Sequence, residues 1–211
     1  EKGNGLFRGI RHAGGWDEDE RVKNAHSHPT PHIYLEDKFQ EGLQELSSLN
    51  MVFDTWHYHN QIKDLTELAK NLPDLVIIHD HFGGPLGIGP YKGKREEIFE
   101  QWKEDIHDLS QCKNVYSKLG GLAMPVNGWD WHKREKPATS DEIISEQGSY
   151  YLYTLDCFGS ERCMFESNFP VDKQSVSYPV IWNAYKKLVK DVGETDKENL
   201  FYRTAEKVYK L

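Results

Sequence analysis

The 211-residue sequence predicts an α/β fold made of parallel strand–loop–helix units. Apolar, strand-like segments alternate with amphipathic helical segments about five times, without repeats or a clear linker, which favours one domain of βαβ units. Polar residues recur at the carboxyl ends of several strands, where barrel enzymes keep their catalytic groups. This favours a (β/α)₈ barrel, although a doubly wound open sheet also places ligands beyond its strand ends.

The first half of the chain contains three strand-like segments. Residues 6–12 lead into a polar segment and a helix over 36–49, and residues 50–58 follow as the second strand. Helical periodicity in Leu65, Leu68 and Leu72 ends before Pro73, and residues 75–80 form a continuous apolar strand.

The second half continues the alternation after a glycine-rich loop at 83–93. An amphipathic helix is marked by Ile98, Trp102, Ile106 and Leu109, and a strand follows at 115–119. A long loop runs to about residue 139, followed by a helix over 141–158, a strand over 163–169, and helices over 179–191 and 195–209.

Composition excludes several classes of partner. With 26 basic and 34 acidic side chains the formal charge is -8, which argues against non-specific nucleic-acid binding and against an anionic membrane surface. We find neither an apolar run of about 20 residues nor a secretory signal, and the three cysteines show no CxxC spacing. We expect a soluble cytoplasmic chain. Because it lacks an initiating methionine and soon enters a strand, we also expect it to be cut from something longer.

Candidate site residues lie at the strand ends. Alternation places polar side chains on one face of four strands: His57 with His59, His79 with His81, Lys118, and Glu166 with Asn168. Arg11 and His12 end the first strand in the same way. The alternate histidines have the spacing that lets two imidazoles face one cavity and bind zinc or a similar metal. A single histidine at a strand end is more often solvated, and Lys118 with Glu166 could form an internal ion pair.

Five sequence segments at or near the strand ends resemble those of a known protein family. FRGIRH at 7–12, FDTWHYHNQ at 53–61, HDHFGGPLG at 79–87, KLGGLAMP at 118–125 and CMFESNFPVDK at 163–173 are the segments concerned. Together they resemble the amidohydrolase-related family of TIM-barrel hydrolases, in the branch of sugar-lactone and pyrone-dicarboxylate lactonases. The resemblance covers essentially the whole chain.

The resemblance implies a (β/α)₈ barrel whose first strand carries an HxH pair. No HxH ends an early strand here, and the visible strands resemble strands four to eight. A full barrel takes ~250 residues. We therefore expect residues 1–211 to be one N-terminally truncated TIM-barrel domain, a partial barrel of about the last five βα units.

The resemblance also assigns roles. His59 and His81 match middle-strand histidines that would bind a divalent metal, zinc by preference, or polarise a carbonyl. Asn168 stands where related lactonases have a water-activating aspartate, and an amide cannot accept that proton. Glu166 or Asp172 could substitute for it.

The expected substrate is a small acidic molecule. Arg11 with His12 would hold its carboxylate, and Lys118 would stabilise an oxyanion. The expected function is hydrolysis of a lactone or cyclic ester of a small acidic compound, in a chain that could form a homo-oligomer. The alternatives are a decarboxylase of the same fold and a non-catalytic fragment or binding scaffold.

Overall fold

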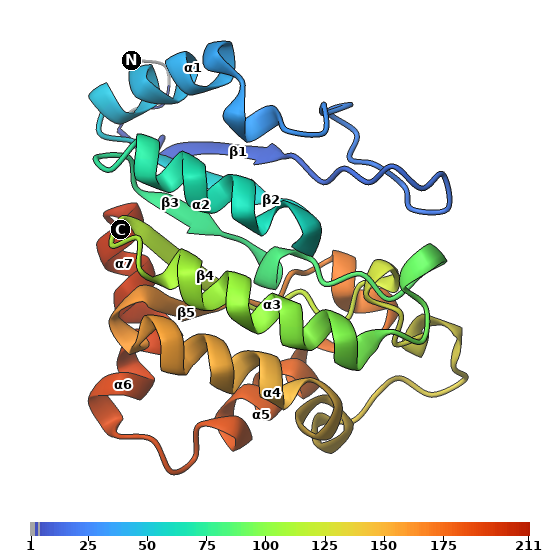
Figure 1. Cartoon of the computed structure of the whole chain (residues 1–211). Coiled ribbons are helices and arrows are strands. Elements are labelled where there is room, and N and C mark those ends of the chain that lie inside the picture. The colour runs from blue at the N-terminus through green and yellow to red at the C-terminus, as the bar shows by residue number, and fades with distance from the viewer. Residues whose placement is uncertain (1–2, 4) are drawn as a thin grey trace.

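The computed structural model describes residue 3 and residues 5–211. Its sheet contains five strands that are all parallel and lie side by side in chain order (Figure 1). The strands are β1 (Gly9–Ala13), β2 (Val52–Trp56), β3 (Ile77–His79), β4 (Val115–Leu119) and β5 (Cys163–Phe165). Parallel neighbours in sequence order are the arrangement of consecutive units in a (β/α)₈ barrel, so the predicted partial barrel is confirmed.

Helices connect the strands and extend beyond the last one. They are α1 (Asp37–Ser48), α2 (Ile62–Asn71), α3 (Arg95–Ser110), α4 (Ser140–Phe158), α5 (Tyr178–Leu188), α6 (Glu194–Glu198) and α7 (Thr204–Tyr209). A π-helical turn, Asn199–Arg203, joins α6 to α7. Single 3₁₀ turns occupy the loops: Ile33–Leu35, His59–Gln61, His81–Gly83, Gly89–Tyr91, Pro125–Asn127, Trp131–Lys133, Ser160–Arg162 and Val171–Gln174.

Local chemistry explains where α4 begins. The Thr139 hydroxyl accepts a hydrogen bond from the Glu142 amide at 3.2 Å, and the Glu142 carboxylate accepts one from the Thr139 amide at 2.8 Å. This reciprocal pair satisfies two amides that a helix start leaves free.

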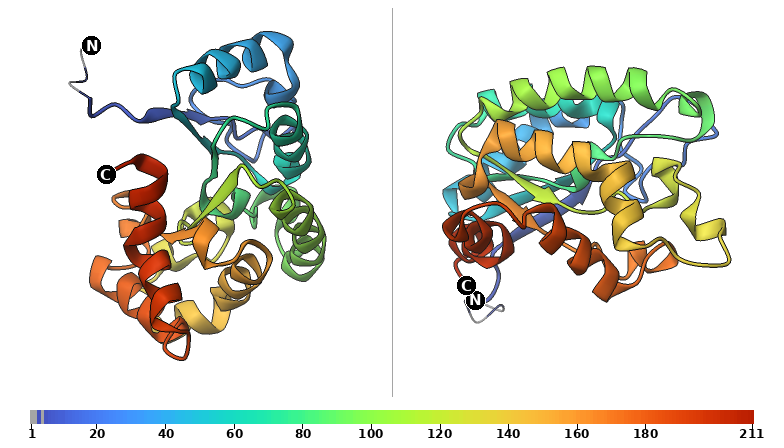
Figure 2. Two further views of the ribbon diagram at one scale, coloured as in Figure 1. Left: turned by 90° about the vertical axis from the view of Figure 1, so that its left-hand side faces the viewer. Right: turned by 90° about the horizontal axis from the view of Figure 1, so that it is seen from below.

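The sheet buries its two faces differently. On one face Phe53, Ile77 and Val115 pack against helix residues such as Leu65 and Trp102 in the main core. On the other face Val52, Ile78 and Met164 pack against Val208 of α7. Figure 2 shows α7 on the side of the sheet opposite α2 and α3. We call the α7 side the inner face, because it corresponds to the interior of a closed barrel.

Three expected strands end earlier than predicted. The strands expected over 50–58, 75–80 and 163–169 stop at Trp56, His79 and Phe165, where the chain turns away from its neighbours. Beyond these points His81 and Asn168 take positive φ values of 56° and 50°, so they no longer follow strand alternation.

The β1 side of the sheet is an open edge. Within the part of the chain described, β1 pairs with β2 alone. Leu6, Phe7 and Ile10 are 79%, 56% and 50% exposed there, which matches the apolar edge expected of an unclosed barrel. Over the same residues, we find no helix with the length and apolar character that a membrane span needs.

Candidate active site

Charged side chains gather where the strands end on the inner face. In the parallel register Arg11 of β1 lies opposite Asp54 of β2, and Lys118 of β4 lies opposite Met164, two residues before Glu166. Asp80 follows β3 directly. Because the carboxyl ends of parallel strands share one rim, these groups meet although they come from five different strands or strand ends.

Lys118 is the centre of a buried ion network. Its Nζ lies 2.5 Å from Asp54 Oδ1 and 3.3 Å from Asp80 Oδ1. Arg11 Nε contacts Asp80 Oδ2 at 3.0 Å, and the Tyr209 hydroxyl donates to Asp54 Oδ1 at 2.6 Å. Burial raises the pKa of Asp80 to about 6 against the opposing charge of Lys118. Burial alone would lower the pKa of Lys118, but Asp80 and Asp54 outweigh it and hold the ammonium charged.

His81 links this network to Glu166. Its Nδ1 contacts Glu166 Oε1, and its Nε2 lies 2.9 Å from Arg11 Nη2. Since a guanidinium can only donate, the network assigns Nε2 as the acceptor and places the proton on Nδ1, next to the Glu166 carboxylate. Burial lowers the pKa of His81, yet the Glu166 carboxylate outweighs it and the net shift is upward.

Gly121 is required beside His81. A Cβ at this position would lie 2.5 Å from His81 Nδ1, and its φ of 84° disfavours any other residue. The loop after β4 therefore fixes the imidazole against Glu166.

Asn168 is coupled to Asp172. Its Nδ2 donates to Asp172 Oδ1 at 2.8 Å, and the Ala123 amide donates to Asp172 Oδ2 at 3.3 Å. Burial raises the pKa of Asp172 to about 7, partly offset by the hydrogen bond from Asn168. Because Asn168 is an amide, Asp172 is the member of this pair that can change its protonation near neutral pH.

A cavity of about 430 Å³ opens above these groups. Arg11, His81 and Asn168 line it, together with Trp56, Met124, Ala13, His26 and Val171. Lys118 and Glu166 do not line the cavity. Lys118 contacts Asp80, which is paired with Arg11, and Glu166 contacts His81. The cavity wall thus combines one guanidinium, two imidazoles, one amide and apolar surface.

Two predicted residues lie elsewhere. The His12 ring packs edge-on against Phe39 of α1, 5.1 Å between centroids, on the face opposite Arg11. Burial and the neighbouring His26 lower its pKa. His59 accepts a hydrogen bond from the Leu86 amide at 3.4 Å, and burial lowers its pKa to about 4. Neither imidazole joins Arg11 and His81, because adjacent strand residues face opposite ways and the chain leaves the strand before residue 59.

The paired-histidine arrangement also differs from expectation. His57 and His79 are fully buried with ring centroids 5.1 Å apart, and His79 shares the helix-facing side with Ile77. They do not face the cavity of His81.

The described side chains do not fit a metal ion. Across residues 3 and 5–211, we find no group of three or more His, Cys, Asp or Glu side chains placed to hold one. The two ring nitrogens of His81 contact Glu166 and the Arg11 guanidinium, and a guanidinium beside Nε2 repels a cation. A catalytic zinc commonly takes three protein ligands.

Three members of the network, Asp54, Asp80 and Tyr209, are not among the residues predicted from the sequence. Asp54 interrupts the apolar strand β2 and Asp80 directly follows the apolar strand β3, so a charge within or next to a buried strand is a signal that the sequence contains. Tyr209 joins Asp54 across 155 residues, a pairing for which the sequence contains no local signal.

Comparisons with known proteins identify the family. The family model described as amidohydrolase matches residues 2–211. An uncharacterized protein, y4mH, from Sinorhizobium fredii is 32% identical over 205 residues, covering 97% of this chain and 61% of that protein. L-fucono-1,5-lactonase from Burkholderia multivorans is 22% identical over 174 residues, covering 82% of this chain and 56% of the lactonase.

A solved structure supports the fold. A Burkholderia multivorans amidohydrolase with bound HEPES superposes with a TM-score of 0.79 at 21% identity, over 97% of this chain and 65% of that one. A Burkholderia multivorans amidohydrolase structure with bound zinc gives a TM-score of 0.77, also at 21% identity, over 97% of this chain and 64% of that one. The chain spans about three-fifths of the length of these relatives. It belongs to the amidohydrolase family, and its five parallel βα units are part of that family's barrel.

Proposed function

We propose that this protein is a hydrolase that opens a lactone or cyclic ester of a small acidic compound. The observation that carries the proposal is the chain of contacts Glu166–His81–Arg11 at the wall of the 430 Å³ cavity. The likeness to a lactonase over most of the chain supports this reaction class. We also propose that residues 1–211 act as one domain within a larger barrel, in line with the length of the relatives.

Arg11 is the proposed substrate anchor. Its side chain is 52% exposed and reaches the cavity, so its guanidinium can bind a carboxylate through paired hydrogen bonds. When Arg11 turns to the substrate, His81 Nε2 loses its present donor and becomes free to accept a proton.

His81 is the proposed general base. Its Nε2 removes a proton from water, the water oxygen bonds to the lactone carbonyl carbon, and the ring C–O bond then breaks. The proton on Nε2 passes to the leaving alkoxide, so the product is an open hydroxy acid and the imidazole is restored. Glu166 orients the ring and stabilises its charged form, as the carboxylate does in other carboxylate–imidazole pairs.

Asn168 and Lys118 have supporting roles in this proposal. Asn168 lines the cavity as an amide donor already oriented by Asp172. Lys118 is paired with two carboxylates. Its proposed role is therefore to hold Asp80 against Arg11, and not to contact the oxyanion directly. The zinc reported with a related structure motivates a metal test, but we assign no step to a metal because the described side chains do not fit one.

A substrate panel tests the proposal. Lactones with and without a carboxylate are supplied to the protein, and acid release is followed with a pH indicator. We expect turnover of acidic lactones, a loss in His81→Gln and Glu166→Gln, and a raised KM in Arg11→Gln. Lys133→Gln, whose exposed side chain lies outside this cavity, is the matched control.

The other outcomes separate the alternatives. Release of carbon dioxide from aromatic acids in place of ring opening would identify a decarboxylase. Absence of turnover with and without added zinc, combined with ligand binding that needs Arg11, would identify a binding scaffold.

A further inference from the structure

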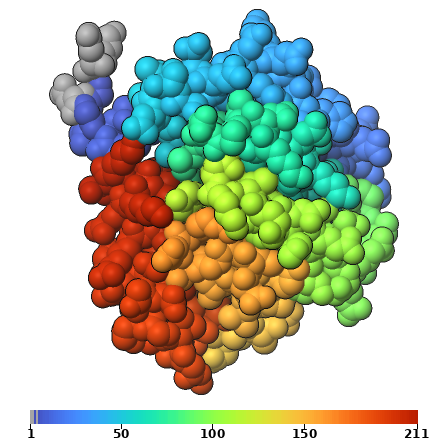
Figure 3. Space-filling model, turned by 60° about the vertical axis from the view of Figure 1, so that its left-hand side comes forward, coloured from blue at the N-terminus to red at the C-terminus, as the bar shows by residue number. Residues whose placement is uncertain are grey.

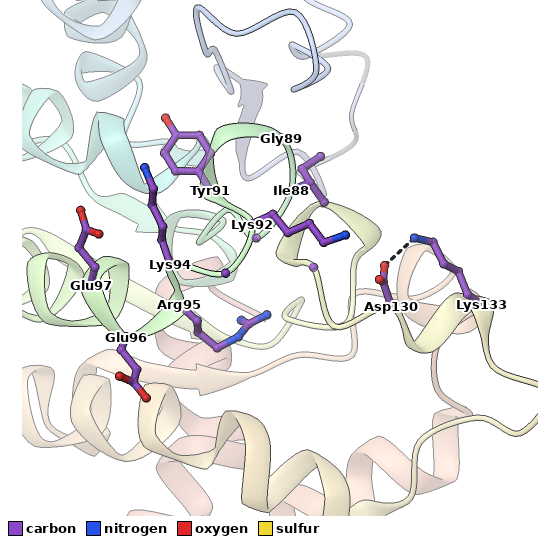
Figure 4. A pocket seen from close by; sticks show the side chains of 13 residues that line it. Ile88, Gly89, Tyr91, Lys92, Lys94, Arg95, Glu96, Glu97, Asp130 and Lys133 are labelled. Atoms are coloured by element: carbon purple, nitrogen blue, oxygen red, sulfur yellow. Dashed lines mark ion pairs between the residues drawn. The ribbon is translucent and has the colours of Figure 1, made fainter.

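A second and larger cavity, of about 870 Å³, lies between the loop after β3 and the loop after β4 (Figure 4). Its lining shares no residue with the cavity of Arg11 and His81. The two loops touch through their backbones: the Gly87 amide donates to the Val126 carbonyl at 2.9 Å, and a Cβ on Gly128 would lie 2.3 Å from the Gly87 oxygen. Both sides of the cavity are therefore fixed against each other.

Arg95 is held in this cavity by uncharged groups. Its Nη2 donates to the Asn127 carbonyl at 3.1 Å, and its guanidinium carbon lies 3.5 Å from the centre of the Trp129 ring. These contacts place the guanidinium without neutralising it, and in Figure 4 it points toward the space between Lys92 and Asp130.

The cavity lining carries four basic side chains, Lys92, Lys94, Arg95 and Lys133, and three acidic ones, Glu96, Glu97 and Asp130. Within residues 3 and 5–211, neither Arg95 nor Lys92 forms an ion pair, whereas Asp130 is matched by Lys133 at 2.8 Å. The carboxylates of Glu96 and Glu97 point away from the Arg95 guanidinium in Figure 4. Within the described residues, Lys92, Lys94 and Arg95 thus line this cavity without an ion-pair partner, on a protein whose net charge is -8.

We propose that this cavity binds a phosphate group, free or carried by a small molecule, with Arg95 and Lys92 as its ligands. A guanidinium offers paired donors that match phosphate oxygens, and an adjacent ammonium adds a mobile point charge. Because Trp129 and Asn127 already fix Arg95, little side-chain freedom is lost when the anion binds. The proposal does not depend on the hydrolase reaction.

Calorimetric titration of the full chain with inorganic phosphate and with glycerol phosphate tests the site. We expect saturable binding, about tenfold weaker in Arg95→Gln, and weaker to a smaller degree in Lys92→Gln. Lys103→Gln is the control, because Lys103 also lies on α3 but pairs with Glu100 and does not line the cavity. Tighter binding of glycerol phosphate than of phosphate would show that the site takes a phosphorylated molecule, and the reverse order would show that it takes the free anion.

Three results would overturn the proposal. They are no saturable binding by the unaltered protein at millimolar phosphate, equal affinity in Lys92→Gln and the unaltered protein, and loss of binding in Arg11→Gln in place of Arg95→Gln. Lys92 is exposed, so its substitution leaves the fold intact and decides the matter even if Arg95→Gln unfolds.

Discussion

Replacing Lys118 by methionine is the sharpest test of the ion network. The change removes the ammonium between two carboxylates whose side chains are 11% exposed in Asp54 and 0% in Asp80. Breaking a buried pair by removing one partner costs about 3–5 kcal/mol, since an uncompensated charge stays buried. Arg11 still contacts Asp80 and Tyr209 still donates to Asp54, so we expect about 3 kcal/mol, the lower end of that range.

Urea denaturation measures this loss, with Lys133→Met as the control. Lys133 pairs with Asp130 at the surface, where the two side chains are 65% and 51% exposed, so its loss should cost about 0–1 kcal/mol. The deficit of Lys118→Met should also depend on pH. Without the ammonium the pKa of Asp80 rises further above about 6, so stability present at acid pH is lost as pH rises through the folded-state pKa.

The reasoning would be refuted in either of two ways. A loss in Lys118→Met no larger than in Lys133→Met would mean that the carboxylates are solvated and need no partner. A deficit that grows below pH 6 would mean that Asp80 is not the group left uncompensated.

Three further predictions concern other parts of the molecule. Asp172→Asn should remove a carboxyl whose raised pKa, about 7, makes the folded state lose stability as pH rises from about 4 to 7. Unfolding at pH 5 and pH 8 should therefore show the variant gaining more on the parent at pH 8 than at pH 5, and a pH-independent difference would contradict this. Gly121→Ala should displace His81 and lower both stability and activity. The control is Gly42→Ala in α1, where no atom lies within 4 Å of the added Cβ and where the change should stabilise the fold by about 0.5–1 kcal/mol. Equal effects of the two changes in thermal melts would count against the packing argument. Ile10→Lys at the exposed β1 edge should shift any self-association toward monomer in light scattering, and an unchanged oligomer would move the contact elsewhere.

The fold was predictable because its signals are periodic and local. The periodicity of Leu65, Leu68 and Leu72 and the continuous apolar run before Asp80 each specify one element, and their alternation specifies parallel units. The π-helical turn that interrupts the expected 195–209 helix has no such signal, since residues 199–203 contain no glycine or proline that would mark a break.

The site was predictable only where strand alternation holds. Arg11 and Lys118 lie within strands and reach the inner face as expected. His59 and His81 lie past the strand ends, where backbone turns decide direction, and only His81 reaches the cavity. The sequence alone could not distinguish these two histidines, because the turn geometry depends on contacts such as the Gly121 approach to His81.

The two ends of the described chain are fastened to each other. Arg8 donates to the Lys210 carbonyl through Nε at 3.2 Å and Nη2 at 3.1 Å, and Lys210 Nζ donates to the Asn50 carbonyl at 3.0 Å. One residue earlier, Tyr209 bonds Asp54 of the buried network. If the two ends are pulled apart, this set of hydrogen bonds is the first contact to bear the load. Pulling it open would detach Tyr209 from Asp54, so the force that separates the termini would also disturb the ion network.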